Sequence, residues 1–476
     1  MNPCTVRSSF EPNPPPVGAC ASGFESTGSI TLRSGQSMSE SSVPGRLARQ
    51  LPIWLAVLCI AASCSRPGPH GPLPKASGRP ASETPQVLAG FWPQFHGPNL
   101  DNLSSETGLL KRWPEGGPEL VWYVEGVGAG FAGVAVVDGM IYTAGNVDGK
   151  TMITALDLDG QIRWRKPNGP AWTREYEGAR GTPSVDGDRL FHLSPSGNLI
   201  AMDAKTGKEL WGRNVLEEFG SKPPHWGLAE SVIIDGDRVI ATPGGPETCV
   251  VALDRKTGRT VWRSASADGD QAGYASPTLA EWGGLRMILQ MTAKALVAVD
   301  ADSGELLFRY PHETRYDVNA TRPIFHDGCV VISSNYGTGT VKLKLRVADG
   351  RVVPEKLWEF KPLDNHHGGV ILVDGYLYGS SNRHWHCVDW QSGQGMYRER
   401  GVGKGSLTCA DGMLYLLSEN GRAGLAAASP EGLELTGQFE LPEGGEGKSW
   451  AHPVVCGGRL YIRHGDFLYA YHVSAP

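Results

Sequence analysis

The segment AMDAKTGKELW (residues 201–211) contains the pattern that decides the fold. An apolar strand ends at Asp203, a Thr-Gly turn follows, and a second strand ends at Trp211. The pattern recurs at ALDLDGQIRW (155–164), ALDRKTGRTVW (252–262) and AVDADSGELLF (298–308), and in looser copies that end at Trp358, Tyr397 and Phe439. Successive terminal aromatic residues are 39 to 51 positions apart. The chain is therefore built from repeats of about 45 residues that contain strands rather than helices.

A second signature, two apolar strands joined by Asp-Gly, alternates with the first. Clear copies are VAVVDGMIYTAG from Val134, VIIDGDRVIATP from Val232 and VILVDGYLYGSS from Val370, and a degenerate one is PTLAEWGGLRMILQ from Pro277. Asp-Gly between apolar runs predicts a tight hairpin, because both residues tolerate a positive φ. Each repeat therefore supplies four strands, which is typical of one propeller blade.

The two ends of the repeat array complement each other. The array begins with a lone outer strand, ELVWYVEG around Trp122, and ends with a hairpin plus FLYAYHV from Phe467 that has no outer strand after it. The sequence therefore predicts an all-β fold: an eight-bladed β-propeller of four-stranded antiparallel blades, closed by the N-terminal strand so that no edge is free.

The repeated aromatic and acidic residues have structural explanations. We expect the terminal aromatics to be buried between neighbouring blades, where each removes about 150–250 Å² from water; they include Trp164, Trp211, Trp262 and Trp358. We expect the repeated aspartates to be turn residues; they are Asp157, Asp203, Asp254, Asp300 and Asp389.

Composition excludes several classes of protein. The 476 residues include 63 Gly without a Gly-X-Y period, which excludes collagen and fits a turn-rich fold. The 44 basic residues against 50 acidic ones give a net charge of −6, which argues against nucleic acid as the main partner. No stretch of eighteen apolar residues follows residue 65, so no later segment is predicted to span a bilayer.

The first ninety residues are predicted to lie outside the propeller. Residues 1–64 form an N-terminal extension with a signal segment: Arg46 and Arg49 precede an apolar run over 51–62. Residues 65–90 form a Pro/Gly/Ser-rich linker, and 91–476 form the propeller domain. Translation from Met38 instead of Met1 would place the basic residues close to the N-terminus.

The sequence Ala61-Ala62-Ser63-Cys64 resembles a bacterial lipobox, although Ala61 stands where Leu is usual. The resemblance implies lipidation of Cys64 and residence in the cell envelope, in the periplasm or on the outer membrane. Ordinary signal-peptidase cleavage and an uncleaved anchor are the alternatives.

The ALDxxTGxxxW repeat over residues 91–476 resembles the pyrroloquinoline-quinone (PQQ) repeat family of propellers. That family includes quinoprotein alcohol dehydrogenases and the non-enzymatic BamB-like lipoproteins. The segment FWPQFHGPNLDNLSSETGLLKRWPEGGPELVW (91–122) resembles an exported bacterial subgroup. The resemblance is specific for fold and much less so for function.

The quinoprotein resemblance implies a vicinal disulfide and a Trp on the two faces of PQQ, a calcium ion held by carboxylate and amide oxygens, and an Asp as general base. The cysteines at 249, 329, 387, 409 and 456 include no adjacent pair, and no CxxC occurs. We therefore expect no cofactor and favour a binding scaffold over a PQQ-dependent dehydrogenase; an unrecognised enzyme that uses the channel is a further alternative. The expected partners are envelope proteins or a small polar ligand or peptide, and the expected state is a monomer.

Residues just before each innermost strand should line one mouth of the central channel. Polar and aromatic side chains gather there, and the candidate ligand-binding residues are Arg180, Trp226, Glu230, Tyr274, Asn319, His366, His367, Lys404, Trp450 and His452. Thr182, Ser231, Ser276, Thr321 and Ser406 lie at equivalent positions. They predict a funnel for a ligand; the structural alternative is that they hydrogen-bond neighbouring blades and hold the ring in register.

Period-two alternation refines this hypothesis. It predicts that only one of His366 and His367 faces the channel, and that Trp450 and His452 share one side. Trp226 and Trp450 are the predicted stacking surfaces, and Arg180, Glu230 and Lys404 add both signs of charge, which suits a zwitterionic or polar ligand. A metal site of His366, His367, His452 and Glu230 is disfavoured, because these residues lack ligand-type spacing.

Overall fold

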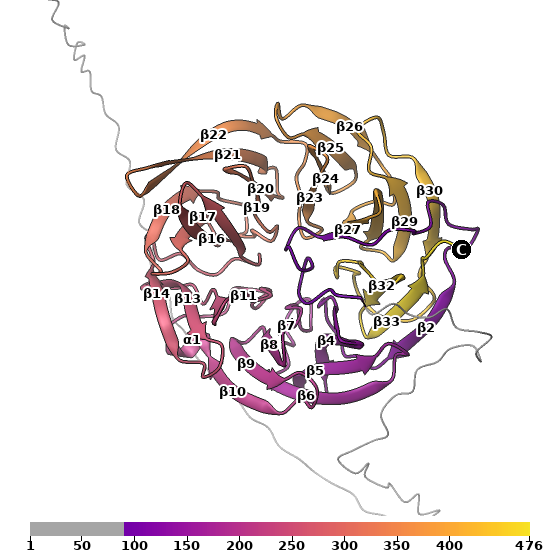
Figure 1. Ribbon diagram of the computed structural model, residues 1–476, viewed down its shortest axis with the longest axis horizontal. Helices are drawn as coiled ribbons and strands as arrows, with labels where there is room; N and C mark the ends of the chain where they lie inside the picture. The colour runs from indigo at the N-terminus through magenta and orange to yellow at the C-terminus, as the bar shows by residue number, and fades with distance from the viewer. Residues whose placement is uncertain (1–89) are drawn as a thin grey trace, which may run out of the picture. The chain divides into compact units, whose positions relative to one another are not determined.

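The computed structural model describes residues 90–476, which form eight sheets around a central channel (Figure 1). Six sheets follow one another along the chain, and each contains four antiparallel strands in sequence order, the first lying innermost. Blade 1 contains β3 (Ala135–Val137), β4 (Met140–Val147), β5 (Lys150–Asp157) and β6 (Ile162–Pro170). Blade 2 contains β7 (Ser184–Asp186), β8 (Arg189–Leu193), β9 (Asn198–Asp203) and β10 (Glu209–Asn214). Blade 3 contains β11 (Ile233–Asp235), β12 (Arg238–Ala241), β13 (Thr248–Asp254) and β14 (Thr260–Ala265).

The next three blades repeat this plan with strands of different length. Blade 4 contains β15 (Thr278–Trp282), β16 (Leu285–Met291), β17 (Ala295–Asp300) and β18 (Leu306–Pro311). Blade 5 contains β19 (Ile324–His326), β20 (Cys329–Ser334), β21 (Gly339–Ala348) and β22 (Arg351–Phe360). Blade 6 contains β23 (Val370–Val373), β24 (Tyr376–Ser380), β25 (Trp385–Asp389) and β26 (Gly395–Glu399).

The last two blades take strands from both ends of the described chain. Blade 7 contains β27 (Gly405–Ala410), β28 (Met413–Ser418), β29 (Arg422–Ala427) and β30 (Leu435–Glu440), and the short β1 (Leu103–Ser104) pairs with β27 in parallel. Blade 8 contains β31 (Val454–Cys456), β32 (Arg459–His464) and β33 (Phe467–His472), with β2 (Leu120–Glu125) as its outer strand. The predicted closure of the ring by the N-terminal strand is therefore confirmed.

Helix is almost absent from the described residues: α1 (Val215–Glu218) is a single turn after β10. Within residues 90–476, no helix is long and apolar enough to cross a bilayer. The five cysteines of this part, Cys249, Cys329, Cys387, Cys409 and Cys456, are free and buried. The signal segment and most of the predicted linker lie outside the described residues.

The repeated tryptophan links five of the eight blades to the next blade. The indole N–H of Trp262 in blade 3 donates to the carbonyl of Ala301 in blade 4 at 3.0 Å. Its ring lies against Gly304, where an added Cβ would come within 2.6 Å of the ring. Gly304 also has a φ of 78°, which an L side chain rarely adopts. Four other tryptophans donate to equivalent turn carbonyls: Trp122 to Leu158, Trp164 to Ala204, Trp211 to Arg255 and Trp358 to Trp390.

The repeated aspartate closes the same turn. Asp300 Oδ1 accepts from the backbone N–H and the hydroxyl of Ser303, both at 2.7 Å. Asp203, Asp254 and Asp389 make the same pair of bonds three residues ahead. The Asp-x-x-Thr/Ser-Gly motif therefore shapes a turn whose glycine receives the preceding blade's aromatic ring.

Residues 91–103, here called the channel loop, occupy the centre of the ring (Figure 1). The backbone of Trp92 pairs with Val136 of β3, and the carbonyl of Pro93 accepts from Val185 of β7. Near the end of the loop, the side-chain amide of Asn102 donates to the carbonyl of Leu407 in β27. The loop thus contacts innermost strands of blades 1, 2 and 7, a role that no motif in the sequence predicted.

Candidate functional site

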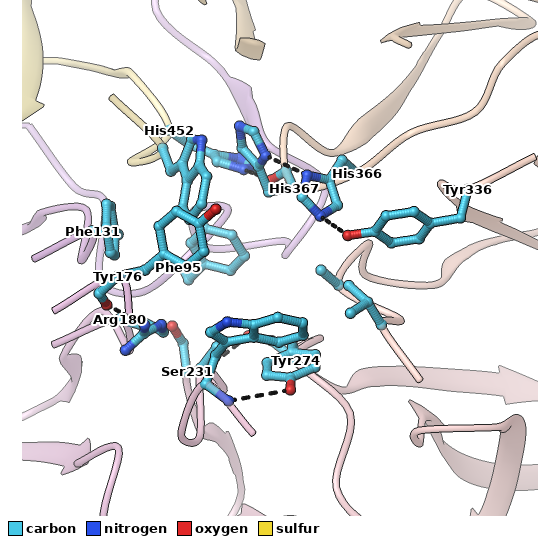
Figure 2. Close-up of a pocket in the computed structure, with 16 residues that line it drawn as sticks. Phe95, Phe131, Tyr176, Arg180, Ser231, Tyr274, Tyr336, His366, His367 and His452 are labelled. Atoms are coloured by element: carbon cyan, nitrogen blue, oxygen red, sulfur yellow. Dashed lines mark hydrogen bonds between the residues drawn. The ribbon is translucent and has the colours of Figure 1, made fainter. Parts of the chain in front are cut away.

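A cavity of about 200 Å³ lies at the end of the channel where the chain enters each innermost strand. Aromatic and imidazole side chains from seven blades and from the channel loop surround it (Figure 2). Its lining consists of Phe95, Phe131, Tyr176, Arg180, Trp226, Ala229, Ser231, Tyr274, Ser276, Val318, Ala320, Tyr336, His366, His367, Trp450 and His452. Exposed ring faces in a concavity are what a ligand with flat or apolar faces requires.

The channel loop supplies the floor. Phe95 stacks on His96 with ring centroids 3.9 Å apart, and its own centroid lies 5.0 Å from that of His452. The His96 Nε2 to His452 Nδ1 distance is 3.0 Å. Arg322 anchors the loop further, because its guanidinium donates to the Phe95 carbonyl. The pocket is therefore closed at its base by the N-terminal segment rather than by blade residues alone.

Trp450 forms one wall of the cavity. Its ring packs against Tyr176, Phe131 and His367, with centroid distances of 4.8, 4.9 and 4.9 Å. Its indole N–H donates to Glu419 Oε2 at 3.2 Å, which fixes the plane of the ring.

Trp226 stands in the blade 3 part of the lining. Its ring lies 5.8 Å from that of Tyr274, and its indole N–H donates to Glu175 Oε2 at 3.3 Å. Both tryptophans are partly exposed, so part of each ring stays accessible.

The histidines form a chain with assignable protons. His452 Nε2 lies 2.9 Å from the carbonyl oxygen of His367, which can only accept, so this nitrogen carries the proton. His452 Nδ1 is then the acceptor for the N–H of His96. Lys404 Nζ lies 3.0 Å from His366 Nδ1, which leaves His366 Nε2 to donate to the Tyr336 hydroxyl at 3.1 Å (Figure 2). The Tyr336 O–H is thereby free to donate to a ligand.

Burial keeps these imidazoles neutral. It lowers the pKa of His452 to about 4, and burial together with the nearby Lys404 charge lowers the pKa of His366 to about 4. The pKa values of His96 and His367 are also held well below 6.5, mainly by burial. Near neutral pH the site therefore offers imidazole donors and acceptors rather than imidazolium charges.

The structure brings most of the predicted candidates together. Arg180, Trp226, Tyr274, His366, His367, Trp450 and His452 line the cavity, and Lys404 stands behind His366. The prediction that Trp450 and His452 share one side agrees with their joint presence in the lining. The prediction that only one of His366 and His367 faces the channel was wrong, because both lie in a bend before β23, where strand alternation does not apply.

The prediction that Glu230 and Asn319 line the mouth was wrong. Glu230 is 2% exposed, and its Oε2 accepts from the backbone N–H of Thr242 at 3.1 Å; burial raises its pKa to about 8. Asn319 is fully buried, and its amide donates to the carbonyls of Thr292, Ala293 and His312. Neither contributes to the lining, so the predicted mixture of charges is replaced by positive charge alone.

The smaller polar residues at the equivalent positions link neighbouring blades, as the structural alternative predicted. The hydroxyl oxygen of Thr182 accepts from Gly133 N, that of Ser231 from Thr182 N, and that of Ser276 from Ser231 N, each at 2.9 Å. Thr321 donates to Asn365 Oδ1 at 2.7 Å, and Ser406 to the carbonyl of Ala451 at 3.1 Å. This belt holds the blades in register directly beside the cavity.

Sequence reasoning missed four aromatic lining residues: Phe95, Phe131, Tyr176 and Tyr336. Phe131 lies in a stretch of small and apolar residues that gave no sign of a binding site. Tyr176 lies four residues before Arg180, outside the positions that were considered. Tyr336 lies in the turn between β20 and β21, which reaches the same end of the ring. An inspection of second-to-third-strand turns could have found Tyr336, but no sequence signal placed Phe95 in the channel.

In the described part of the chain, no group of three His, Cys, Asp or Glu side chains is arranged to hold a metal ion. Glu230 does not join the histidines, since it points into its own blade and bonds to Thr242. The histidines bond to one another, to Lys404 and to Tyr336 instead.

Comparison with known proteins adds a family context. The profile of the family described as outer membrane protein assembly factor BamB matches residues 149–399, just over half of the chain. A quinoprotein ethanol dehydrogenase of Pseudomonas aeruginosa is 31% identical over 159 residues, which are 30% of this chain and 25% of that protein. The outer membrane protein assembly factor BamB of Kangiella koreensis is 28% identical over 215 residues, which are 44% of this chain and 49% of that protein. The chain thus spans between a quarter and half of the length of these two relatives.

Among solved structures, BamB from Moraxella catarrhalis is similar in fold, with a TM-score of 0.52 and 16% identity over 73% of this chain and 97% of that one. Agreement at this level of identity concerns the fold and carries no information about the ligand.

Proposed function

Since the chain belongs to the PQQ-repeat propeller family described as outer membrane protein assembly factor BamB, we propose that it is a ligand-binding propeller of the cell envelope. Its site is the aromatic cavity at the mouth of the channel. One observation carries the proposal: the channel loop closes the base of a pocket whose walls are partly exposed aromatic rings. The bound molecule is a small one with at least one flat ring.

The polar groups of the cavity are suited to orienting such a ligand. The hydroxyl oxygens of Ser231 and Ser276 each accept a backbone N–H, and their own protons remain available. The Tyr336 hydroxyl is free to donate in the same way, because His366 bonds to its oxygen. A few directed donors among many apolar faces is the usual composition of a small-molecule site.

The lining does not fit PQQ with its calcium ion. Calcium requires several carboxylate or amide oxygens, and no Asp, Glu, Asn or Gln of residues 90–476 lines this cavity. The buried cysteines are dispersed over five different blades, so they offer no sulfur pair for one face of a quinone. We therefore derive no quinone chemistry for this chain.

A dehydrogenase is the second candidate function, favoured by the similarity to the quinoprotein ethanol dehydrogenase. Its test is to add PQQ and calcium to the purified protein and to follow dye reduction with alcohols and sugars. We expect no turnover above background; clear turnover would reverse the order of the two candidates.

A protein partner at the same mouth is a third candidate, supported by three exposed tyrosines. Tyr176, Tyr316 and Tyr336 are 51%, 49% and 37% exposed, and Tyr316 packs edge-on against Tyr336. Exposed tyrosines are common in protein interfaces. Cross-linking in intact cells through a photoreactive residue at position 316 would identify such a partner, and the absence of any protein adduct would contradict this role.

We propose that the protein is held in the cell envelope by a lipid on Cys64, a residue that lies outside the described part of the chain. Labelled palmitate should be incorporated by the wild type and not by Cys64→Ala. Equal incorporation by the two proteins, or none by either, would contradict the lipid anchor.

The ligand-binding role is tested by thermal-shift screening of a library of one-ring and two-ring compounds. We expect several to raise the Tm of the wild type and to lose this effect in Trp450→Ala. Trp282→Ala is a matched control, because Trp282 is 38% exposed but lies at the C-terminal end of β15, outside the cavity lining, where its indole N–H donates to the carbonyl of Leu345. Equal shifts in the wild type and Trp450→Ala would show that binding occurs elsewhere.

A further inference from the structure

The cavity contains one permanent charge. Of its sixteen lining residues only Arg180 is ionised near neutral pH, because burial keeps the lining histidines neutral. An aromatic pocket with a single guanidinium has a positive potential that its low-dielectric walls strengthen.

Arg180 has no acidic partner in the described structure. Its Nη1 donates to the carbonyl of Gly178 at 2.9 Å and its Nη2 to the carbonyl of Tyr176. Its guanidinium lies over the ring of Phe131, 5.5 Å from the centroid. These contacts orient the group without neutralising it, and they occupy two of its five N–H donors.

Three carboxylates around the mouth have partners other than Arg180. Glu175 accepts from the indole N–H of Trp226, and Glu419 lies 3.6 Å from Lys404 and accepts from Trp450. Glu230, which could have balanced the charge, is buried against Thr242. The positive charge of Arg180 is thus left for a ligand.

We infer that the ligand is an anion, namely a flat-ringed carboxylate whose carboxylate group binds to Arg180 while its ring packs against Trp226 and Trp450. This inference rests on the proposed ligand-binding function and specifies its substrate class. The planar guanidinium matches the two oxygens of a carboxylate. The volume of about 200 Å³ is below the range of about 300–1,000 Å³ of drug-sized sites, which limits the body of the ligand to one or two rings.

Ring-matched pairs of acid and amide separate charge from shape. Benzoate and benzamide, and indole-3-acetate and indole-3-acetamide, are titrated into the wild-type protein by calorimetry at low salt. We expect each acid to bind at least tenfold more tightly than its amide, and the difference to shrink as salt is added.

Variants then locate the effect. Arg180→Gln should make each acid bind no better than its amide, and Arg180→Lys should keep part of the preference because it keeps the charge. Arg174→Gln is the matched control, since Arg174 lies over Trp172 outside the cavity lining and should leave the preference intact.

The outcomes distinguish this inference from the proposed function. If amides bind as tightly as acids in the wild type, the pocket binds ligands but the anion inference is wrong. If acids are preferred equally in the wild type and Arg180→Gln, the preference comes from another group and the assignment to Arg180 is wrong. If no member of either pair binds to any of these proteins, the proposed binding function itself is contradicted.

Discussion

Tryptophan serves two regions of the molecule in different ways. One region is the contact between neighbouring blades, here called the seam, and the other is the mouth of the channel. Trp262 in a seam is 7% exposed, and its N–H donates to a backbone carbonyl of the next blade. Trp450 at the mouth is partly exposed, and its N–H donates to the carboxylate of Glu419. The seam arrangement recurs around the ring, whereas the mouth arrangement is found in the described residues only at Trp450 and at Trp226, whose N–H donates to Glu175. Features that repeat therefore build the ring, and features that depart from the repeat build the site.

The largest effect should come from removing the N-terminal segment that serves both regions. Deleting residues 91–126 removes β2, which pairs with β33, and the floor of the cavity. We expect an unfolded or aggregated product, because an apolar sheet edge becomes free. Circular dichroism and size-exclusion chromatography would show this, with a chain that begins at residue 90 as the control. A soluble monomer that unfolds cooperatively would contradict ring closure by β2.

Exchanging tryptophan for alanine compares the two regions directly. Trp262→Ala should lower the free energy of unfolding by about 3–5 kcal/mol, as expected for a large aromatic removed from a core. Trp450→Ala should cost less than about 1 kcal/mol while abolishing ligand binding. Urea denaturation of both variants measures these values. If Trp450→Ala also costs several kcal/mol, Trp450 is an inter-blade strut and not a ligand-binding surface.

Acidification should act on both regions, since each contains buried neutral histidines. Burial lowers the pKa of His192 in β8 and of His452 at the mouth to about 4, below the value of about 6.5 in the unfolded chain. The unfolded state therefore binds protons first, and the unfolding free energy should fall as the pH drops from about 6.5 toward 4. Each fully buried histidine contributes up to about 2 kcal/mol between pH 7 and pH 5, at about 1.4 kcal/mol per pKa unit.

Urea titrations at several pH values would measure that slope. His192→Gln and His452→Gln should each make it shallower. A wild-type unfolding free energy that stays constant from pH 7 to pH 5 would show that these histidines are not held neutral by the fold.

Two glycine variants separate seam packing from backbone strain. Gly304 and Gly187 both have a positive φ, of 78° and 59°, but only Gly304 lies against a ring, that of Trp262. Gly187→Ala should cost about 1 kcal/mol from strain alone, and Gly304→Ala roughly 1–3 kcal/mol more from the clash with Trp262. Equal losses of thermal stability in the two variants would mean that the seam adapts to the extra methyl group.

Most of the ring could be predicted from the sequence because its contacts repeat. The Asp-x-x-Thr-Gly turn and the terminal aromatic of each unit, such as Asp254 and Trp262, specify both a local turn and a contact to the next blade. Closure by residues 120–125 could be predicted because the first fragment supplies the strand that the last blade lacks.

The site could be predicted only in part. Residues just before the innermost strands had to lie near one mouth, which correctly brought Arg180, Trp226 and Trp450 together. The orientation of Glu230 could not be predicted from the sequence. The backbone before β11 is irregular there, and the carboxylate accepts a hydrogen bond from the backbone of Thr242. The channel loop could not be predicted either, because its contacts, such as Trp92 with Val136, link residues without a shared pattern.

The central claim is that the aromatic cavity at the mouth is the place where this propeller binds its ligand. The most direct test is a crystallographic fragment screen, in which crystals of residues 90–476 are soaked with flat-ringed acids and their amides. We predict that bound fragments gather in the cavity between Trp226 and Trp450, with the carboxylate of each acid at Arg180. Fragments that bind only elsewhere on the propeller, in crystals where solvent reaches this mouth, would contradict the claim.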